Sequence, residues 1–187
     1  YIDQQVKKLD FPEVLILKPL KYFDNRGFFF ENFNIEDFKS KTGILFNVSQ
    51  ENISFSKNNV LRGLHFQKGE FKQSKLISVI KGKIFDVIVD IRPNSDNFGK
   101  WLSYILDDEN DESIFIPSGF AHGFLSLANN TKISYKVDKP YNKEAECSII
   151  WNDVDICIDW KCPNPILSEK DKGSLTLDEN LKLNNFY

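Results

Sequence analysis

Short apolar runs separated by turn residues recur along the chain. Apolar residues fill 14–17, and apolar and polar residues alternate over 85–91 and 133–137. A period of two is typical of strands, because successive side chains point to opposite faces of a sheet. Further short apolar runs lie at 28–33, 75–80, 101–106, 114–116, 149–151 and 156–160. Many short strands at this spacing predict an all-β sandwich or closed barrel.

Two positions suggest helices at the edge of this β structure. Asn34 is suited to cap a helix that has Asp37 at its third position and ends at Gly43. The polar segment after Ser168 has room for a second, short helix. Because no repeat, linker or low-complexity stretch divides the chain, we expect one all-β domain over 1–187 with a few short peripheral helices.

Composition narrows the class of protein without changing this picture. The chain has 187 residues, of which 41% are hydrophobic and 27% charged, as in an ordinary globular domain. A net charge of −3 argues against a sequence-independent nucleic-acid binder. The longest apolar runs are far shorter than a membrane span, so we expect no membrane partner. Most of the 17 Phe rings should be buried in strands and interfaces.

The cysteine and histidine counts bear on chemistry. The chain has three cysteines, Cys147, Cys157 and Cys162, and no Cys-x-x-Cys pair. We therefore expect no disulfide framework and a cytoplasmic protein. With only His65 and His122 present, a His-rich metal cluster is impossible. Metal-binding cupins use a His-x-His pair, whereas this chain has His65-Phe66-Gln67. We therefore expect no metal and no cofactor.

The segment Arg62-Gly63-Leu64-His65-Phe66-Gln67 crowds polar groups into an apolar strand. Burying such groups costs free energy unless they find partners, so the segment is either a functional site or a strand with a satisfied core histidine. In a regular strand Arg62 and His65 point to opposite faces. Gly63 between them could permit a bulge that re-aims one of them.

Residues 115–124 predict a strand, a turn and then His122 among small residues. Gly119 and Gly123 would let backbone approach a ligand closely, while the alternative is a turn with an exposed histidine. Tyr135 stands on the apolar side of its strand and could simply be a core residue.

Two further candidates also have ordinary explanations. Tyr141 follows Pro140 in a loop-like stretch, and Lys75 at the start of an apolar strand could simply point at water. Phosphate-binding glycine loops and a Gly-x-Ser-x-Gly elbow are missing from the sequence, which sets aside several enzyme classes.

Taken together and in order, eight segments make the sequence closely resemble one enzyme family. They are Phe23–Glu31, Gln50–Ser54, Val60–Gln67, Phe85–Arg92, Ile116–Phe124, Tyr135–Lys136, Trp151–Asp153 and Leu167–Asp171. Over about 12–171 the chain is similar to the dTDP-4-dehydrorhamnose 3,5-epimerases, which have a cupin-type β-barrel, or jelly-roll, fold. Departures are confined to 68–72, which lacks the usual prolines, and to Trp160-Lys161-Cys162-Pro163.

The resemblance implies an isomerase that inverts C3, C5 or both in a nucleotide-linked 4-keto-6-deoxy sugar, for deoxysugar or surface-polysaccharide synthesis. It implies His65 as catalytic base, Tyr135 as proton donor, Asp171 as the carboxylate that pairs with the base, and Lys75 near the sugar ketone. The implied substrate contacts, with Tyr141 grouped among them, are Arg26, Glu31, Gln50, Asn52, Arg62, His122, Tyr141, Glu146 and Lys170. It also implies a homodimer that exchanges its N-terminal segment, so Arg26 and Glu31 would serve the partner's site.

The chemistry explains why such groups are needed. A ketone at C4 acidifies the C–H bonds at C3 and C5, and inversion requires a base on one face and an acid on the other. Alternatives on the same scaffold are a C3-only epimerase and an epimerase of GDP-linked keto-heptoses. A non-catalytic sugar-binding barrel is less favoured, because binding alone needs neither base nor acid.

Overall fold

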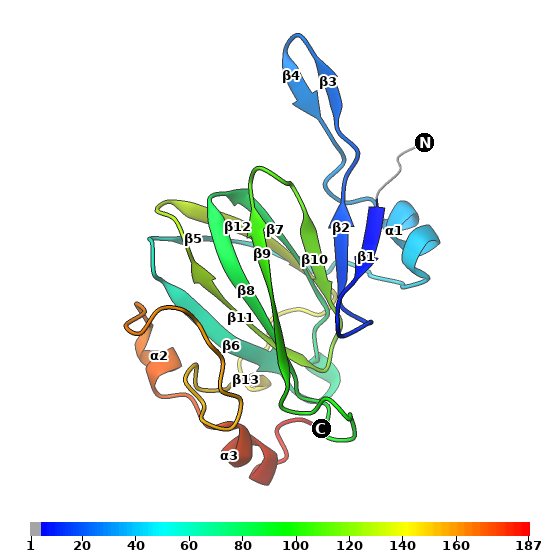
Figure 1. The fold of residues 1–187 in the computed structure, drawn as a ribbon. Coiled ribbons are helices and arrows are strands. Elements are labelled where there is room, and N and C mark those ends of the chain that lie inside the picture. Colours follow the sequence, from blue (N-terminus) through cyan, green and yellow to red (C-terminus); the bar gives the residue numbers. More distant parts are fainter. Residues whose placement is uncertain (1–4) are drawn as a thin grey trace.

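The structure, a computed structural model, describes residues 5–187 and consists mainly of two antiparallel sheets that face each other (Figure 1). The first sheet contains, in spatial order, β1 (Gln5–Lys8), β2 (Leu15–Lys18), β10 (Ser113–Ile116), β7 (Lys75–Lys81), β12 (Thr131–Val137) and β5 (Gln50–Ser56). The second contains β13 (Glu146–Ser148), β6 (Leu61–Gln67), β11 (Phe120–Ser126), β8 (Lys83–Asp90) and β9 (Trp101–Asp107). The predicted all-β class is confirmed.

Apolar side chains form layers between the sheets and on their outer faces. The layer between them joins Ile77 and Ile133 of the first sheet to Ile88 and Phe124 of the second. A second layer covers the outer face of the second sheet with residues from the C-terminal segment, among them Trp160. The second sheet is therefore buried on both faces, and every residue of β11 is buried.

Helix α1 (Ile35–Thr42) begins and ends where the sequence predicts. The Asn34 side chain accepts hydrogen bonds from the backbone N–H groups of Glu36 and Asp37, at 3.1 and 3.2 Å. Gly43 ends the helix with a φ of 73°, a left-handed conformation that glycine adopts without a steric cost. Phe38 of α1 packs with Phe115 of β10, so the helix covers the outer face of the first sheet.

The C-terminal segment differs from the prediction. Residues 149–151 and 156–160 do not form strands; they lie in a loop whose apolar side chains cover the second sheet. Positive φ values of 54° at Cys157 and 59° at Lys161 are incompatible with a strand there. The Asp153 carboxylate holds the loop by accepting from the backbone of Ile156 at 3.1 Å. Two short helices follow, α2 (Glu169–Lys172) and α3 (Leu177–Lys182), where one was expected.

The remaining short elements are a 3-10 turn, η1 (Gly69–Phe71), and a hairpin of β3 (Tyr22–Asp24) and β4 (Gly27–Phe29). The hairpin projects away from the two sheets (Figure 1). It carries exposed aromatic rings, with Phe23 74% and Phe29 66% exposed, so these phenylalanines are not buried within the chain's own fold. The predicted strand at 28–33 ends already at Phe29.

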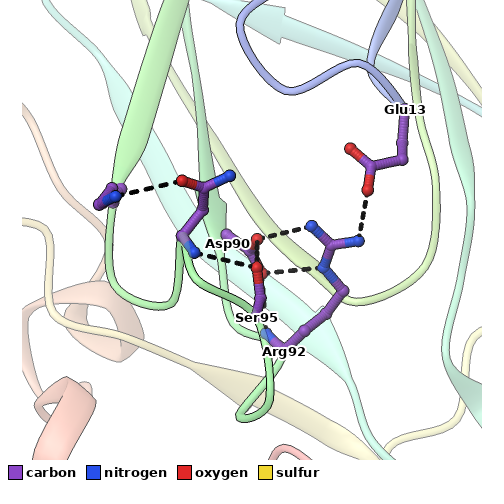
Figure 2. Close-up of polar contacts among 6 residues, drawn as sticks. Glu13, Asp90, Arg92 and Ser95 are labelled. Atoms are coloured by element: carbon purple, nitrogen blue, oxygen red, sulfur yellow. Dashed lines mark hydrogen bonds and ion pairs between the residues drawn. The ribbon is translucent and has the colours of Figure 1, made fainter.

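A buried polar cluster fixes the end of β8, as Figure 2 shows. Asp90 is fully buried and accepts hydrogen bonds from Arg92 Nη2 at 2.6 Å and from Ser95 Oγ at 2.7 Å. Arg92 Nη1 in turn donates to Glu13 at 2.7 Å, and its guanidinium lies 4.5 Å from the centre of the Phe120 ring. The cluster joins the loop after β8 to the turn between β1 and β2.

Candidate active site

A bulge in β6 brings Arg62 and His65 to the same cavity. His65 pairs with His122 of β11 and Arg62 pairs with Phe124, so three steps along β6 match two along β11. Gly63 has a φ of 128°, and a Cβ atom there would lie 2.5 Å from the Cα of Gly123. Only glycine fits this close approach, and the extra residue places both side chains on the cavity wall. The bulge expected at Gly63 is confirmed.

The cavity lies between the sheets and has a volume of about 480 Å³. It is lined by nine of the residues singled out from the sequence, which are Gln50, Asn52, Arg62, His65, Lys75, His122, Tyr135, Tyr141 and Glu146. Ser54, Phe66, Gln67, Gln73, Phe124 and Ile133 complete the wall. The size suits a small-molecule ligand.

His65 is paired with a buried carboxylate. Its Nε2 lies 2.6 Å from Oδ1 of Asp171, which is only 3% exposed at the start of the C-terminal helices. The Ser168 hydroxyl caps α2 by accepting from the backbone N–H of Asp171 at 3.1 Å, which fixes the carboxylate in place. Burial favours the protonated form of Asp171, but its hydrogen bond to His65 and the charge of that ring outweigh burial and lower its pKa.

Lys75 faces His65 from the other sheet. The Lys75 side chain is 9% exposed, and Nζ donates to the backbone oxygen of His65 at 3.3 Å. Burial lowers the pKa of Lys75 to about 8, while the negative charges of Asp86 and Glu146 act in the opposite direction. The ammonium therefore stays charged near neutral pH although it lies in the interior.

Tyr135 lies on the same sheet as Lys75, in the strand next to it. It is half-buried, and burial raises its pKa more than the positive charge of Arg62 lowers it. The phenol is therefore protonated at neutral pH. Tyr141 lies at the cavity mouth, where its hydroxyl donates to Glu146 at 3.0 Å and its backbone N–H donates to Gln50 at 3.0 Å.

Glu146 connects the cavity to helix α2. Besides the bond from Tyr141, it forms an ion pair with Lys170, which lies beside Asp171. Burial raises the pKa of Glu146, but the hydrogen bonds from Lys170 and Tyr141 reverse that effect and hold it below the usual range. Lys170 thus reaches the cavity wall through Glu146 and does not line the cavity itself.

Sequence reasoning missed Asp86, the partner of the second histidine. Asp86 of β8 is fully buried, and its Oδ1 lies 2.6 Å from Nε2 of His122. The alternation over 85–91 predicted a strand and gave no role to its polar positions. Asp86 lies on the face of Ile84 and Ile88, between the sheets, and a charged residue at that position was the available signal.

Comparison with known proteins identifies the family. Residues 8–179 match the family model described as dTDP-4-dehydrorhamnose 3,5-epimerase. The chain belongs to the dTDP-4-dehydrorhamnose 3,5-epimerase family. The enzyme of that name from Escherichia coli strain K12 is 47% identical over 179 residues, covering 95% of this chain and 97% of the relative.

Solved structures of this epimerase family share the fold. One is dTDP-6-deoxy-D-glucose-3,5-epimerase from Legionella pneumophila in complex with dTDP-4-keto-L-rhamnose, with a TM-score of 0.90 and 40% identity, covering 94% of this chain and 93% of that one. Another is ChmJ, a 3'-monoepimerase from Streptomyces bikiniensis in complex with dTDP-quinovose, with a TM-score of 0.89 and 30% identity, covering 95% and 90%. The cupin-type fold implied by the resemblance is confirmed.

Two residues that the epimerase resemblance placed in the site are not brought there within this chain. Arg26 is exposed at the tip of the β3–β4 hairpin and is held by Asp24, with 2.6 Å from Nη2 to Oδ2. Glu31 accepts from Asn34 at 3.4 Å, and neither Arg26 nor Glu31 lines the cavity. The hairpin that carries Arg26 projects away from the two sheets, and Glu31 follows it (Figure 1).

The described part of this epimerase chain, 5–187, holds no group of three or more His, Cys, Asp or Glu residues suited to a metal ion. The amide of Gln67 bonds to backbone instead, donating to Phe71 and accepting from Asn142 at 2.8 and 2.7 Å. Among the same residues the cysteines are unpaired, and no helix is long and apolar enough to cross a membrane.

Proposed function

We propose that this chain is a 3,5-epimerase that inverts C3 and C5 of a nucleotide-linked 4-keto-6-deoxy sugar of the dTDP-4-dehydrorhamnose type. One observation carries the proposal. The cavity has an imidazole with a buried carboxylate on one sheet, and a protonated phenol and a buried ammonium on the facing sheet. Epimerisation needs this division, because the proton leaves on one face and returns on the other.

His65 is the proposed base. Since Nε2 is engaged by Asp171, Nδ1 is the ring nitrogen available to take a proton from C3 or C5. The imidazolium that forms is stabilised by the neighbouring carboxylate, which keeps its charge because its pKa is lowered. An imidazole suits this step, because it titrates near neutral pH.

Lys75 and Tyr135 are the proposed partners of the base. Removal of a proton next to the ketone places negative charge on the C4 oxygen, and the Lys75 ammonium, itself buried, would stabilise that enolate. Tyr135 would then deliver a proton to the carbon from the facing sheet. Every proton transfer in this mechanism uses a side chain of the protein, so the mechanism requires no metal or cofactor.

The substrate's diphosphate and sugar would be held by the polar wall of the cavity. Arg62 can form paired hydrogen bonds with phosphate oxygens, and Lys170 adds positive charge through its position beside Glu146. Gln50, Asn52, His122 and Tyr141 supply further hydrogen-bonding groups on the wall. Because these contacts are local, the net negative charge of the chain does not oppose binding.

We further propose a homodimer in which the β3–β4 hairpin lies at the partner's cavity. Support comes from the exposed Phe23 and Phe29 rings and from Arg26 and Glu31, which do not reach the cavity of their own chain. The unpaired cysteines fit a cytoplasmic enzyme that supplies deoxysugars for surface polysaccharides.

Mixing two inactive variants tests the exchange of the hairpin. In a dimer of Arg26→Ala with His65→Asn, exchange leaves one of the two sites with both native residues. Mixed dimers should then recover up to about a quarter of wild-type activity on random assortment. A mixture that stays inactive, or sedimentation at the 21.7 kDa mass of one chain, would contradict the exchanged dimer.

The reaction itself is tested by solvent deuterium incorporation, read by NMR at C3 and C5 of dTDP-4-keto-6-deoxyglucose. Wild type should incorporate deuterium at both carbons, and His65→Asn should incorporate it at neither. Incorporation at C3 alone would favour the monoepimerase alternative represented by ChmJ, and preference for a GDP-linked heptose would favour that substrate. Binding without exchange would leave only a sugar-binding barrel.

A further inference from the structure

The cavity wall contains a second imidazole–carboxylate pair beside the first. His122 lies directly across the β6–β11 ladder from His65, and each ring uses Nε2 to contact a buried carboxylate at 2.6 Å. The carboxylate of His122 belongs to Asp86, which is 0% exposed. In both pairs, Nδ1 is the nitrogen left for the cavity.

Asp86 also has an unsatisfied oxygen. Within the described chain, its Oδ2 is buried and has no hydrogen-bond partner, which is costly for a carboxylate and calls for a compensating charge. Burial raises the pKa of Asp86, and the positive charges of His122 and Lys75 oppose that rise. Asp86 in turn raises the pKa of Lys75, and among the nearby charges it favours the ammonium form most strongly.

We propose that Asp86 is a positioning residue for the epimerisation. It holds the His122 ring through Nε2, and it supplies the negative charge that keeps Lys75 a cation where the sugar ketone would bind. Its effect on turnover rests on the proposed function. Its effect on His122 and Lys75 does not.

Other charged groups around Lys75 do not replace Asp86. From the packed strands, the titratable or charged groups facing this part of the cavity are Asp86 (β8), Glu146 (β13), His65 and Arg62 (β6), His122 (β11) and Tyr135 (β12). Glu146 is already engaged by Lys170 and Tyr141, and Asp171 by His65. Asp86 is engaged by His122 through Oδ1 alone and its Oδ2 has no partner, and its charge favours the ammonium form of Lys75 more than the charge of Glu146 does.

The state of His122 can be measured without turnover. Because the chain has only two histidines, ¹⁵N-histidine labelling gives a simple spectrum, and His65→Asn leaves His122 alone in it. Nε2 of His122 should carry the proton of the neutral ring, because it donates to the Asp86 carboxylate. A His122 ring protonated at Nδ1 with Nε2 bare would overturn the proposal.

The kinetic test uses Asp86→Asn, which can still accept a hydrogen bond from His122 but has no charge. In wild type kcat should decrease above about pH 8, where Lys75 loses its proton. In Asp86→Asn this decrease should begin about 1 pH unit lower. At pH 8 kcat should then fall by about fivefold with KM little changed, because the charged fraction of Lys75 drops from about one half to about one tenth. Asp90→Asn is the matched control, since Asp90 is equally buried on β8 but bonds Arg92 and Ser95 away from the cavity.

The outcomes separate the two proposals. A folded Asp86→Asn protein whose decrease in kcat with pH coincides with that of wild type, or shifts no more than that of Asp90→Asn, overturns the role of Asp86. An inactive wild type refutes the epimerase function and leaves the ¹⁵N spectrum to decide the role of Asp86. If Asp86→Asn does not fold, that same wild-type spectrum is decisive.

Discussion

Replacing Lys75 by methionine should make the protein more stable and inactive at the same time. Lys75 is a buried ammonium with one hydrogen bond, to the His65 backbone oxygen at 3.3 Å. Methionine has a similar length and no charge, so Lys75→Met removes the cost of burying the ammonium and also removes the cation proposed to stabilise the enolate.

The magnitude follows from the pKa of Lys75. Its value falls from 10.5 to about 8 on folding, a difference of about 2.5 units. At about 1.36 kcal/mol per unit, this corresponds to about 3 kcal/mol of folding free energy lost at pH 7. Since the hydrogen bond is lost as well, the net gain should be about 1–3 kcal/mol. Loss of one preorganised charge should lower kcat by about 10²–10³-fold.

The sign of the pH dependence adds a second check. Below pH 8 both folded and unfolded wild type carry the proton, so the cost is fully present. Between about pH 8 and 10.5 the folded state loses the proton first, and wild type regains stability as pH rises. The advantage of Lys75→Met should therefore shrink over this window.

Urea unfolding at pH 7 and pH 10, at equal protomer concentration, measures both effects. Lys132→Met, at an exposed lysine of β12, gives the background effect of the substitution. If Lys75→Met is less stable than wild type at pH 7, or if its advantage is the same at both pH values, the account of Lys75 as a costly buried cation is wrong.

Three further predictions test separate parts of the site. Asp171→Asn should lower kcat by about 10²–10⁴-fold in a turnover assay, because the His65 imidazolium loses its counter-charge; activity within twofold of wild type would refute this role. Activity should survive exhaustive dialysis against EDTA, and a loss that one specific metal restores would contradict side-chain proton transfer. Gly63→Ala should destabilise the fold, measured by urea unfolding, by about 1–3 kcal/mol more than Gly27→Ala. The two glycines have similar φ values, 128° and 135°, so the backbone strain of the substitution is matched. Of the two, only Gly63 has backbone where the new Cβ would lie. Equal destabilisation would mean that the approach to Gly123 does not require glycine.

Local chemistry made parts of this structure predictable. Asn34 and Gly43 determine the ends of α1 through bonds and conformations within a few residues, so the sequence alone locates that helix. Gly63 between Arg62 and His65 is a local signal too, and the bulge forms there. The cavity then gathers most of the residues implied by the family resemblance.

The features that were missed depend on contacts distant in sequence. Asp86 shares a strand face with Ile84 and Ile88, which pack between the two sheets, so its carboxylate is buried there and pairs with His122. The apolar runs at 149–151 and 156–160 resemble strands, yet they cover the outer face of the second sheet. Arg26 lies on the β3–β4 hairpin and Glu31 follows it, and neither lines the cavity of its own chain.

Tyr135→Phe tests the division of labour between the two sheets most directly. The substitution keeps the ring and removes only the hydroxyl, so proton removal by His65 should continue while delivery from the opposite face slows by about 10²–10⁴-fold. Tyr104→Phe is the control, since its hydroxyl bonds Glu112 and does not line the cavity. Product stereochemistry and deuterium content are measured together by NMR. The account predicts deuterium incorporated with retained configuration faster than inverted product forms; inversion at the wild-type rate would contradict it and make Tyr141 the next candidate acid.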